Sequence, residues 1–394
     1  MRHIPYGKQD ISQADIAAVV AVLESDYITQ GPVIEQFETQ VASYCKVAHG
    51  VALNSATSAL HVACLALDIG PGDVVWTSPN TFVASANCAI YCGAQPDFVD
   101  IDPRTYNLCI GALEEKLKKT RRAGKPLPKL VIAVHFAGQS CDMQALSKLA
   151  GEYGFHVLED ASHAIGASYR NEPVGHCQFS DACVFSFHPV KLVTSGEGGM
   201  VVTRSGKLAD RMRQLRSHGV VREPQSDAQG LQEPWQYQQT ALGFNYRITD
   251  IQAALGLSQM TRLDEFVSKR HTLADSYKRQ LQSSDLTLPF QSGHTRSSYH
   301  LYPVLVANTR SRRSVRNRLY HHLQAAGIGV NVHYIPVHSQ PYYREMGFQY
   351  GDFPVAEAYY ERTLTLPLYT TLSDSDQDRV IDALGSFDLY QQAA

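Results

Sequence analysis

The stretch FSFHPVKLVTSGEGG, residues 185–199, joins an apolar run, a single lysine and a glycine-rich turn. Lys191 has apolar neighbours on both sides in the sequence. Apolar surroundings lower the pKa of a lysine and make its amine a nucleophile. Gly196, Gly198 and Gly199 allow a ligand to approach the main chain closely. The stretch therefore predicts a buried strand that delivers a reactive amine to a ligand site.

Short apolar runs alternate with helix-like segments on the N-terminal side of this stretch, and a further run follows it. This alternation predicts βα units and an α/β fold with a mostly parallel sheet between helices. Ligands of such sheets bind beyond the carboxyl ends of the strands, so the residues after each strand are candidate site residues. The expected strands lie in 51–55, 73–79, 96–102, 129–138, 155–160, 182–187 and 199–203.

The chain has 394 residues, which is too long for one simple core. The segment 249–282 has helical periodicity and is predicted to link two domains. We expect a large domain over residues 1–258, followed by an interdomain helix and a smaller C-terminal α/β domain over 259–394. The smaller domain is predicted from apolar runs at 300–307 and 329–337 and from helical patterns at 314–327 and 373–387.

The composition argues against several classes of function. The formal net charge is −3, and the basic cluster 116–122 reads as a solvated helix end, so no nucleic-acid partner is expected. No stretch approaches the roughly 20 apolar residues of a membrane-spanning helix. The N-terminus lacks the features of a signal peptide. These observations predict a cytoplasmic protein without a membrane partner.

The eight cysteines form no CxxC pair, and most lie in apolar patterns. Buried reduced thiols are the default interpretation of such cysteines. A zinc site is the weaker alternative, because ligand pairs at zinc spacing are missing. No metal is therefore expected.

The first expected strand ends in NSATS, residues 54–58, where a helix begins. The N–H groups and the dipole at a helix start favour an anion such as phosphate. Taken alone, the motif is better explained as an ordinary N-cap. The fingerprints GxGxxG and GxxxxGK[ST] are absent here, which argues against a dinucleotide fold and a P-loop kinase.

Other strand ends carry Asp160, Ser186 and Phe82. A buried carboxylate needs a cationic partner such as a protonated ring nitrogen, although Asp160 could also cap a turn. Phe82 could stack on a planar ring, although core packing explains this residue better when it is considered by itself. Together with Lys191 and the anion site, these residues match what pyridoxal phosphate requires: an anion site, an acid, an amine and a ring partner.

The sequence resembles the sugar aminotransferases of the DegT/DnrJ/EryC1/StrS family, in the aspartate aminotransferase (fold type I) superfamily, over nearly its whole length. Within that family, IPYGKQDI, HPVK and VHYIPVH followed by PYYREMGF resemble the branch that acts in pseudaminic acid biosynthesis. Ala56 stands where the family often has glycine. Some relatives are dehydratases with histidine in place of the lysine, but Lys191 is present here. The matching stretches are 27–38, 53–61, 78–87, 98–107, 159–166, 185–199, 215–220, 243–260 and 332–338.

The resemblance implies pyridoxal 5′-phosphate as cofactor and an aspartate-aminotransferase-like fold. Lys191 matches the lysine that binds the cofactor covalently, and Asp160 the acid that pairs with its pyridine nitrogen. Phe82 matches the aromatic over the ring, and His163 a polar position beside the phenolic oxygen. Ala56, Thr57, Ser58 and Ser186 match the family's residues that bind the cofactor phosphate. Asn245 matches an asparagine that reaches the phosphate in the neighbouring subunit.

The resemblance also implies a homodimer whose active sites are shared between the subunits. It further implies that the enzyme moves the amino group of L-glutamate to the C4 ketone of a UDP-linked 4-keto-6-deoxy-N-acetylhexosamine. Alternatives are another UDP- or dTDP-linked 4-ketosugar, or a sugar dehydratase on the same fold. His188 could contact substrate or brace the turn. The positions that match the sugar-nucleotide pocket are Tyr6, Asp26, Tyr27, Ile28, Thr29, Asn331, Val332, His333 and Tyr334.

Overall fold

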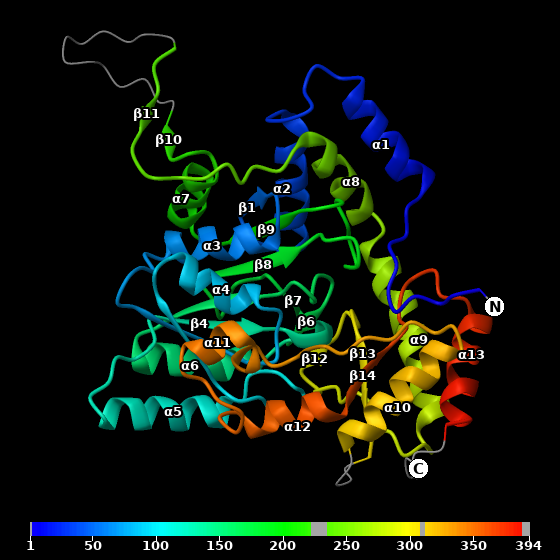
Figure 1. Ribbon diagram of the computed structural model, residues 1–394. Coiled ribbons are helices and arrows are strands. Elements are labelled where there is room, and N and C mark those ends of the chain that lie inside the picture. The colour runs from blue at the N-terminus through cyan, green and yellow to red at the C-terminus, as the bar shows by residue number, and fades with distance from the viewer. Residues whose placement is uncertain (1, 222–234, 308–311, 388–394) are drawn as a thin grey trace, which may run out of the picture.

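The computed structural model describes residues 2–221, 235–307 and 312–387, and a seven-stranded sheet lies at its centre (Figure 1). The strand order is β1-β9-β8-β5-β4-β2-β3. All neighbouring strands pair in parallel except β9, which runs antiparallel to β1 and β8. The mostly parallel sheet predicted from the sequence is confirmed. Its strands are β1 (His49–Leu53), β2 (Val74–Thr77), β3 (Gln95–Phe98), β4 (Leu130–Val134), β5 (His156–Asp160), β8 (Ala182–Ser186) and β9 (Gly199–Thr203).

Helices cover both faces of this sheet because successive residues of its buried strands point to opposite sides. Val184 of β8 packs with α3, α4 and α7, whereas Phe185 packs with α2 and α8. Val131 of β4 faces α5 and α6. These helices are α2 (Pro32–Tyr44), α3 (Ala56–Ala66), α4 (Ala84–Tyr91), α5 (Ile110–Arg122), α6 (Met143–Tyr153), α7 (Gly206–Arg216) and α8 (Asp250–Met260).

The predicted linking segment forms two helices, α8 and α9 (Leu263–Leu281), which are separated at Thr261 and Arg262. Side chains of α9 join a separate core with β13 (Tyr302–Leu305), α10 (Arg312–Ala325), β14 (Thr363–Leu366) and α13 (Asp374–Gly385). The division at residue 258 stays a prediction. The apolar run 329–337 forms only one bridge, between Asn331 and Thr365, and otherwise passes as extended chain and the short helix η2 (Val337–Ser339).

The N-terminal arm crosses to this second core (Figure 1). Ile4 is buried there and bridges Ile328, and the carbonyl of Tyr6 accepts a hydrogen bond from Leu368 N–H at 3.2 Å. After the arm, α1 (Gln13–Leu23) packs on α8. The remaining elements are short: β6 (Ser168–Tyr169), β7 (Glu172–Pro173), β10 (Val220–Val221), β11 (Gln238–Gln239), β12 (Thr295–Arg296), η1 (Phe136–Gly138), α11 (Pro341–Glu345) and α12 (Pro354–Arg362).

Within the described ranges, no helix combines the length and apolarity needed to cross a membrane. All eight cysteines are free thiols, and seven of them are buried. The described residues also contain no group of three or more His, Cys, Asp or Glu side chains placed to hold a metal ion.

Candidate active site

A cavity of about 420 Å³ lies at the carboxyl ends of β1, β5 and β8. Because parallel strands end at one edge of a sheet, residues far apart in the sequence meet here. The 331–334 segment and the N-terminal arm complete the wall. Of the predicted site residues, Tyr6, Ala56, Thr57, Phe82, Asp160, His163, Ser186, Lys191, Asn331, Val332, His333 and Tyr334 line this cavity.

Asp160 is the last residue of β5 and is 5% exposed. Its Oδ2 accepts a hydrogen bond from Ser85 Oγ at 2.6 Å, and its Oδ1 accepts from the N–H and Oγ of Ser162 at 3.1 and 2.6 Å. Hydrogen bonds to a carboxylate favour its charged form. The Asp160 carboxylate is therefore suited to pair with a protonated nitrogen in the cavity.

Lys191 lies in the turn after β8, and its main-chain N–H donates to His188 carbonyl at 2.9 Å. Among the described residues, none accepts a hydrogen bond from Lys191 Nζ. Burial lowers the pKa of Lys191 to about 8, and the charge of Asp160 opposes part of that effect. The amine thus carries a lone pair in a useful fraction of molecules near neutral pH, as a nucleophile or base requires.

The start of α3 forms an anion site next to the lysine. Ser55 caps the helix by accepting Ser58 N–H at 3.1 Å, while the N–H groups of Ala56 and Thr57 have no partner in the described part of the chain. A Cβ at Gly199 would lie 2.4 Å from the Ser55 carbonyl oxygen, so β9 approaches this cap only without a side chain. Two free N–H groups at a helix start suit a phosphate.

Two neutral histidines, His163 and His333, line the cavity. His163 Nδ1 accepts Ala137 N–H at 3.3 Å, and its Nε2 lies 3.1 Å from Tyr334 Oη. Burial, assisted by Lys191 and His333, holds the pKa of His163 well below its usual value. Burial and Lys191 likewise lower the pKa of His333 to about 3. Lys191 is therefore the cation that faces these rings.

His300 is a cavity residue that the sequence reasoning missed. Its ring lies against that of His163, with a centroid distance of 4.5 Å and a tilt of 42°, and its buried Nδ1 has no hydrogen-bond partner among the described residues. The sequence carried little signal for it, since it is only the first residue of the expected apolar run 300–307. Ser85 and Ser162 were missed as well, because only the folded chain shows that they bond Asp160.

Some predicted residues lie outside the cavity of the single chain. Segment 26–29 and Asn245 are exposed. Ser58 is buried, and its hydroxyl donates to Asn54 Oδ1 at 2.7 Å.

Two residues lie at the edge of the cavity. Phe82 lines the cavity, and 59% of the residue is exposed. His188 is exposed at the rim and braces the lysine turn through its carbonyl. The roles assigned to these residues remain predictions.

A mostly parallel α/β sheet with a lysine, a carboxylate and a helix start at one cavity defines the aspartate aminotransferase-like class, fold type I. Within that class, the chain belongs to the DegT/DnrJ/EryC1/StrS aminotransferase family, whose model matches residues 9–385. The chain is therefore a sugar aminotransferase.

The chain is similar to characterised relatives over almost its whole length. It is 40% identical to the spore coat polysaccharide biosynthesis protein SpsC of Bacillus subtilis, over 97% of this chain and 96% of that one. It is 35% identical to the UDP-4-amino-4,6-dideoxy-N-acetyl-beta-L-altrosamine transaminase of Campylobacter jejuni, over 97% of each chain.

Solved structures agree with the sequence comparison. Helicobacter pylori PseC, an aminotransferase involved in the biosynthesis of pseudoaminic acid, superposes with a TM-score of 0.88 at 30% identity, over 97% of this chain and 98% of that one. The PLP form of the putative sugar aminotransferase Spr1654 from Streptococcus pneumoniae superposes with a TM-score of 0.87 at 30% identity, over 97% of each chain.

Proposed function

We propose that this enzyme uses pyridoxal 5′-phosphate to move the amino group of L-glutamate to the C4 ketone of UDP-2-acetamido-2,6-dideoxy-β-L-arabino-hex-4-ulose. The product is UDP-4-amino-4,6-dideoxy-N-acetyl-β-L-altrosamine. The observation that carries the proposal is the Lys191 amine, which has no hydrogen-bond acceptor among the described residues and shares a cavity with the hydrogen-bonded carboxylate of Asp160. The names of the Campylobacter and Helicobacter relatives support this choice of sugar.

The residues of the cavity fit the cofactor. Lys191 would bind its aldehyde, Asp160 would face its pyridine nitrogen, and the N–H groups of Ala56 and Thr57, with Ser186, would hold its phosphate. When bound, the cofactor supplies an electron-accepting ring that stabilises negative charge at the carbon losing a proton.

The protein side chains then handle the protons. Asp160 keeps a proton on the nitrogen that it meets, because its own charge is stabilised by Ser85 and Ser162. Lys191 Nζ takes the proton from the α-carbon of glutamate, and in the second half-reaction it delivers a proton to C4 of the sugar. Glutamate leaves as 2-oxoglutarate before the ketosugar reacts, so we expect ping-pong kinetics.

We further propose a homodimer with shared sites, which is supported by the apolar side chains exposed around the predicted partner contacts. Tyr27, Ile28 and Leu242 are 58%, 50% and 81% exposed. Mixing a Lys191→Ala dimer with an Asn245→Asp dimer tests this, since a hybrid dimer would contain one site with both native residues. Recovery of activity on mixing supports the shared site, and additive residual activity refutes it.

The reaction is tested by spectroscopy and product analysis. The holoenzyme should show an absorbance band near the visible edge that shifts on adding glutamate, and Lys191→Ala should lack both the band and turnover. Incubation with a panel of UDP- and dTDP-4-ketosugars, analysed by mass spectrometry, identifies the substrate. Another nucleotide 4-ketosugar is the second candidate, because SpsC is more similar to this chain than the Campylobacter enzyme is.

A further inference from the structure

The loop formed by residues 135–141 lies between His163 and the segment that carries His300. Ala137 N–H donates to His163 Nδ1 at 3.3 Å, and Ala137 carbonyl accepts from Leu301 N–H at 3.4 Å. Ala137 has a φ of +58°, a backbone conformation that residues other than glycine rarely adopt. Contacts elsewhere in the fold must therefore hold this loop in place.

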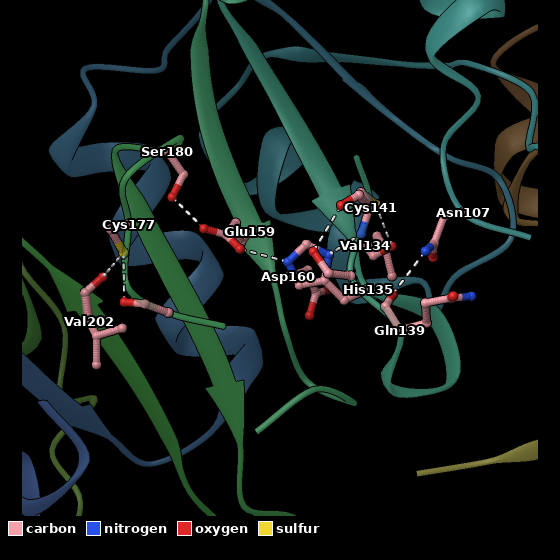
Figure 2. Close-up of polar contacts among 12 residues, drawn as sticks. Asn107, Val134, His135, Gln139, Cys141, Glu159, Asp160, Cys177, Ser180 and Val202 are labelled. Atoms are coloured by element: carbon pink, nitrogen blue, oxygen red, sulfur yellow. Dashed lines mark hydrogen bonds and ion pairs between the residues drawn. The ribbon is translucent and has the colours of Figure 1, made fainter. Parts of the chain in front are cut away.

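One of these contacts is a buried histidine–carboxylate pair between the loop and β5 (Figure 2). His135 Nε2 lies 2.7 Å from Glu159 Oε2, and the two side chains are 0% and 7% exposed. His135 Nδ1 accepts Cys141 N–H at 3.2 Å, while Nε2 on the other side of the ring faces Glu159. The pair thus joins β5 to both ends of the loop. Ser180 Oγ donates to the other carboxylate oxygen at 2.5 Å.

Asn107 holds the same loop from the opposite side. Its Nδ2 donates to Gln139 carbonyl at 2.9 Å, and its Oδ1 accepts Phe136 N–H at 2.8 Å. Asn107 is 3% exposed, so these bonds are shielded from water. The position of the Ala137 N–H is therefore fixed by side chains that do not touch the cavity.

The fixed N–H determines which nitrogen of His163 carries hydrogen. Because Nδ1 accepts from Ala137 and the ring is neutral, the hydrogen is on Nε2. Nε2 lies 3.1 Å from Tyr334 Oη, so His163 donates to Tyr334. Tyr334 lines the cavity, and no acceptor within the described residues takes the hydrogen of its hydroxyl.

We infer that Ala137 N–H, His163 and Tyr334 form a hydrogen-bond chain of fixed direction that leaves the Tyr334 hydroxyl as a donor to an oxygen atom of the bound ligand. In this arrangement His135 and Glu159 are positioning residues, because they act through the loop. The identity of the ligand rests on the proposed function: the oxygen is the C4 oxygen of the ketosugar. Bonds in series strengthen one another, and a fixed donor stabilises negative charge that develops on oxygen.

The direction of the chain is tested on the protein without cofactor. Nitrogen NMR of ¹⁵N-histidine-labelled protein distinguishes the two ring tautomers, and loss of signals in His163→Gln assigns the residue. We expect hydrogen on Nε2 and none on Nδ1. Hydrogen on Nδ1 overturns the inference, and this result does not depend on any catalytic activity.

The positioning role is tested with Glu159→Ala and a matched control. His338 and Glu357 form another buried pair at 2.9 Å that does not line the cavity, so Glu357→Ala loses a similar contact elsewhere. Both variants should be less stable in urea, but only Glu159→Ala should give a mixture of His163 tautomers. Identical tautomers in the two variants refute the positioning role. If Glu159→Ala does not fold, Asn107→Ala provides the same comparison.

The donor role is tested by Tyr334→Phe in single-turnover reactions of the amino-loaded enzyme with the UDP-4-ketosugar. Loss of a fixed donor to a developing negative charge should slow this half-reaction by about 10²–10³-fold. Cofactor affinity, measured by fluorescence, should be unchanged. An unchanged rate overturns the donor role. A holoenzyme without the expected absorbance band would instead contradict the proposed function and leave the tautomer result valid.

Discussion

Replacing Lys191 with methionine should stabilise the protein when no cofactor is bound. The Lys191 amine has no hydrogen-bond acceptor in the described structure, and burial lowers its pKa from 10.5 to about 8. At about 1.4 kcal/mol for each pH unit, this difference corresponds to about 3.5 kcal/mol in the free energy of unfolding. Methionine has a similar length and no charge to bury, while Asp160 keeps its three hydrogen bonds from Ser85 and Ser162.

The effect should depend on pH with a defined sign. The folded-state pKa of Lys191 lies below the unfolded value, so the unfolded chain binds more protons between pH 8 and 10.5. The stability of the wild-type protein relative to the variant therefore rises with pH across this window. The advantage of methionine should be complete below about pH 8 and should vanish above about pH 10.5.

Urea unfolding of the cofactor-free proteins at several pH values measures this difference. Lys116→Met is the matched control, because Lys116 also has a lowered pKa but pairs with Asp97 at 2.6 Å and donates to Phe98 carbonyl at 2.5 Å. That variant should be destabilised. If Lys191→Met is as destabilised as the control at pH 7, then the charge of Lys191 does not destabilise the folded protein and the reasoning fails.

Three further substitutions probe the surroundings of the cavity. Arg270 is 2% exposed and donates hydrogen bonds to the carbonyls of Tyr299, His300 and Leu368. Arg270→Met should therefore lower the free energy of unfolding, measured in urea, by about 3–5 kcal/mol. A loss below about 1 kcal/mol would contradict this expectation. Gly199→Val should weaken cofactor affinity at least tenfold in a fluorescence titration, because its Cβ would displace the cap of α3; unchanged affinity would disprove the close-approach argument. Asp160→Asn should fold normally by circular dichroism, but the rate of its glutamate half-reaction should fall by at least about 10²-fold, because a neutral amide does not hold a proton on the ring nitrogen. A wild-type rate would refute this role of Asp160.

The sequence was sufficient to predict the strand ends that build the cavity. Alternating apolar runs indicated where β1, β5 and β8 end, and the parallel arrangement then brought Ala56, Asp160 and Lys191 together. These predictions depended only on local patterns and on one rule about parallel sheets. They did not require knowledge of any single side-chain contact.

The partners of these residues could not be predicted in the same way. Ser85 and Asp160 are 75 positions apart, and nothing in either local pattern favours that pair. The same is true of His300, whose ring contact with His163 depends on the path of the loop 135–141. Local periodicity determines which end of a strand a residue occupies, but tertiary packing determines what it touches.

The N-terminal arm has a consequence for the order of assembly during synthesis. Ile4 packs against residues near 328, and the carbonyl of Tyr6 bonds Leu368, so the arm depends on residues made more than 300 positions later. The sheet can form on the ribosome once β9 has emerged, but the wall contributed by Tyr6 and Tyr334 must wait until Leu368 has been made. A nascent chain would therefore have a folded sheet before it had a closed site.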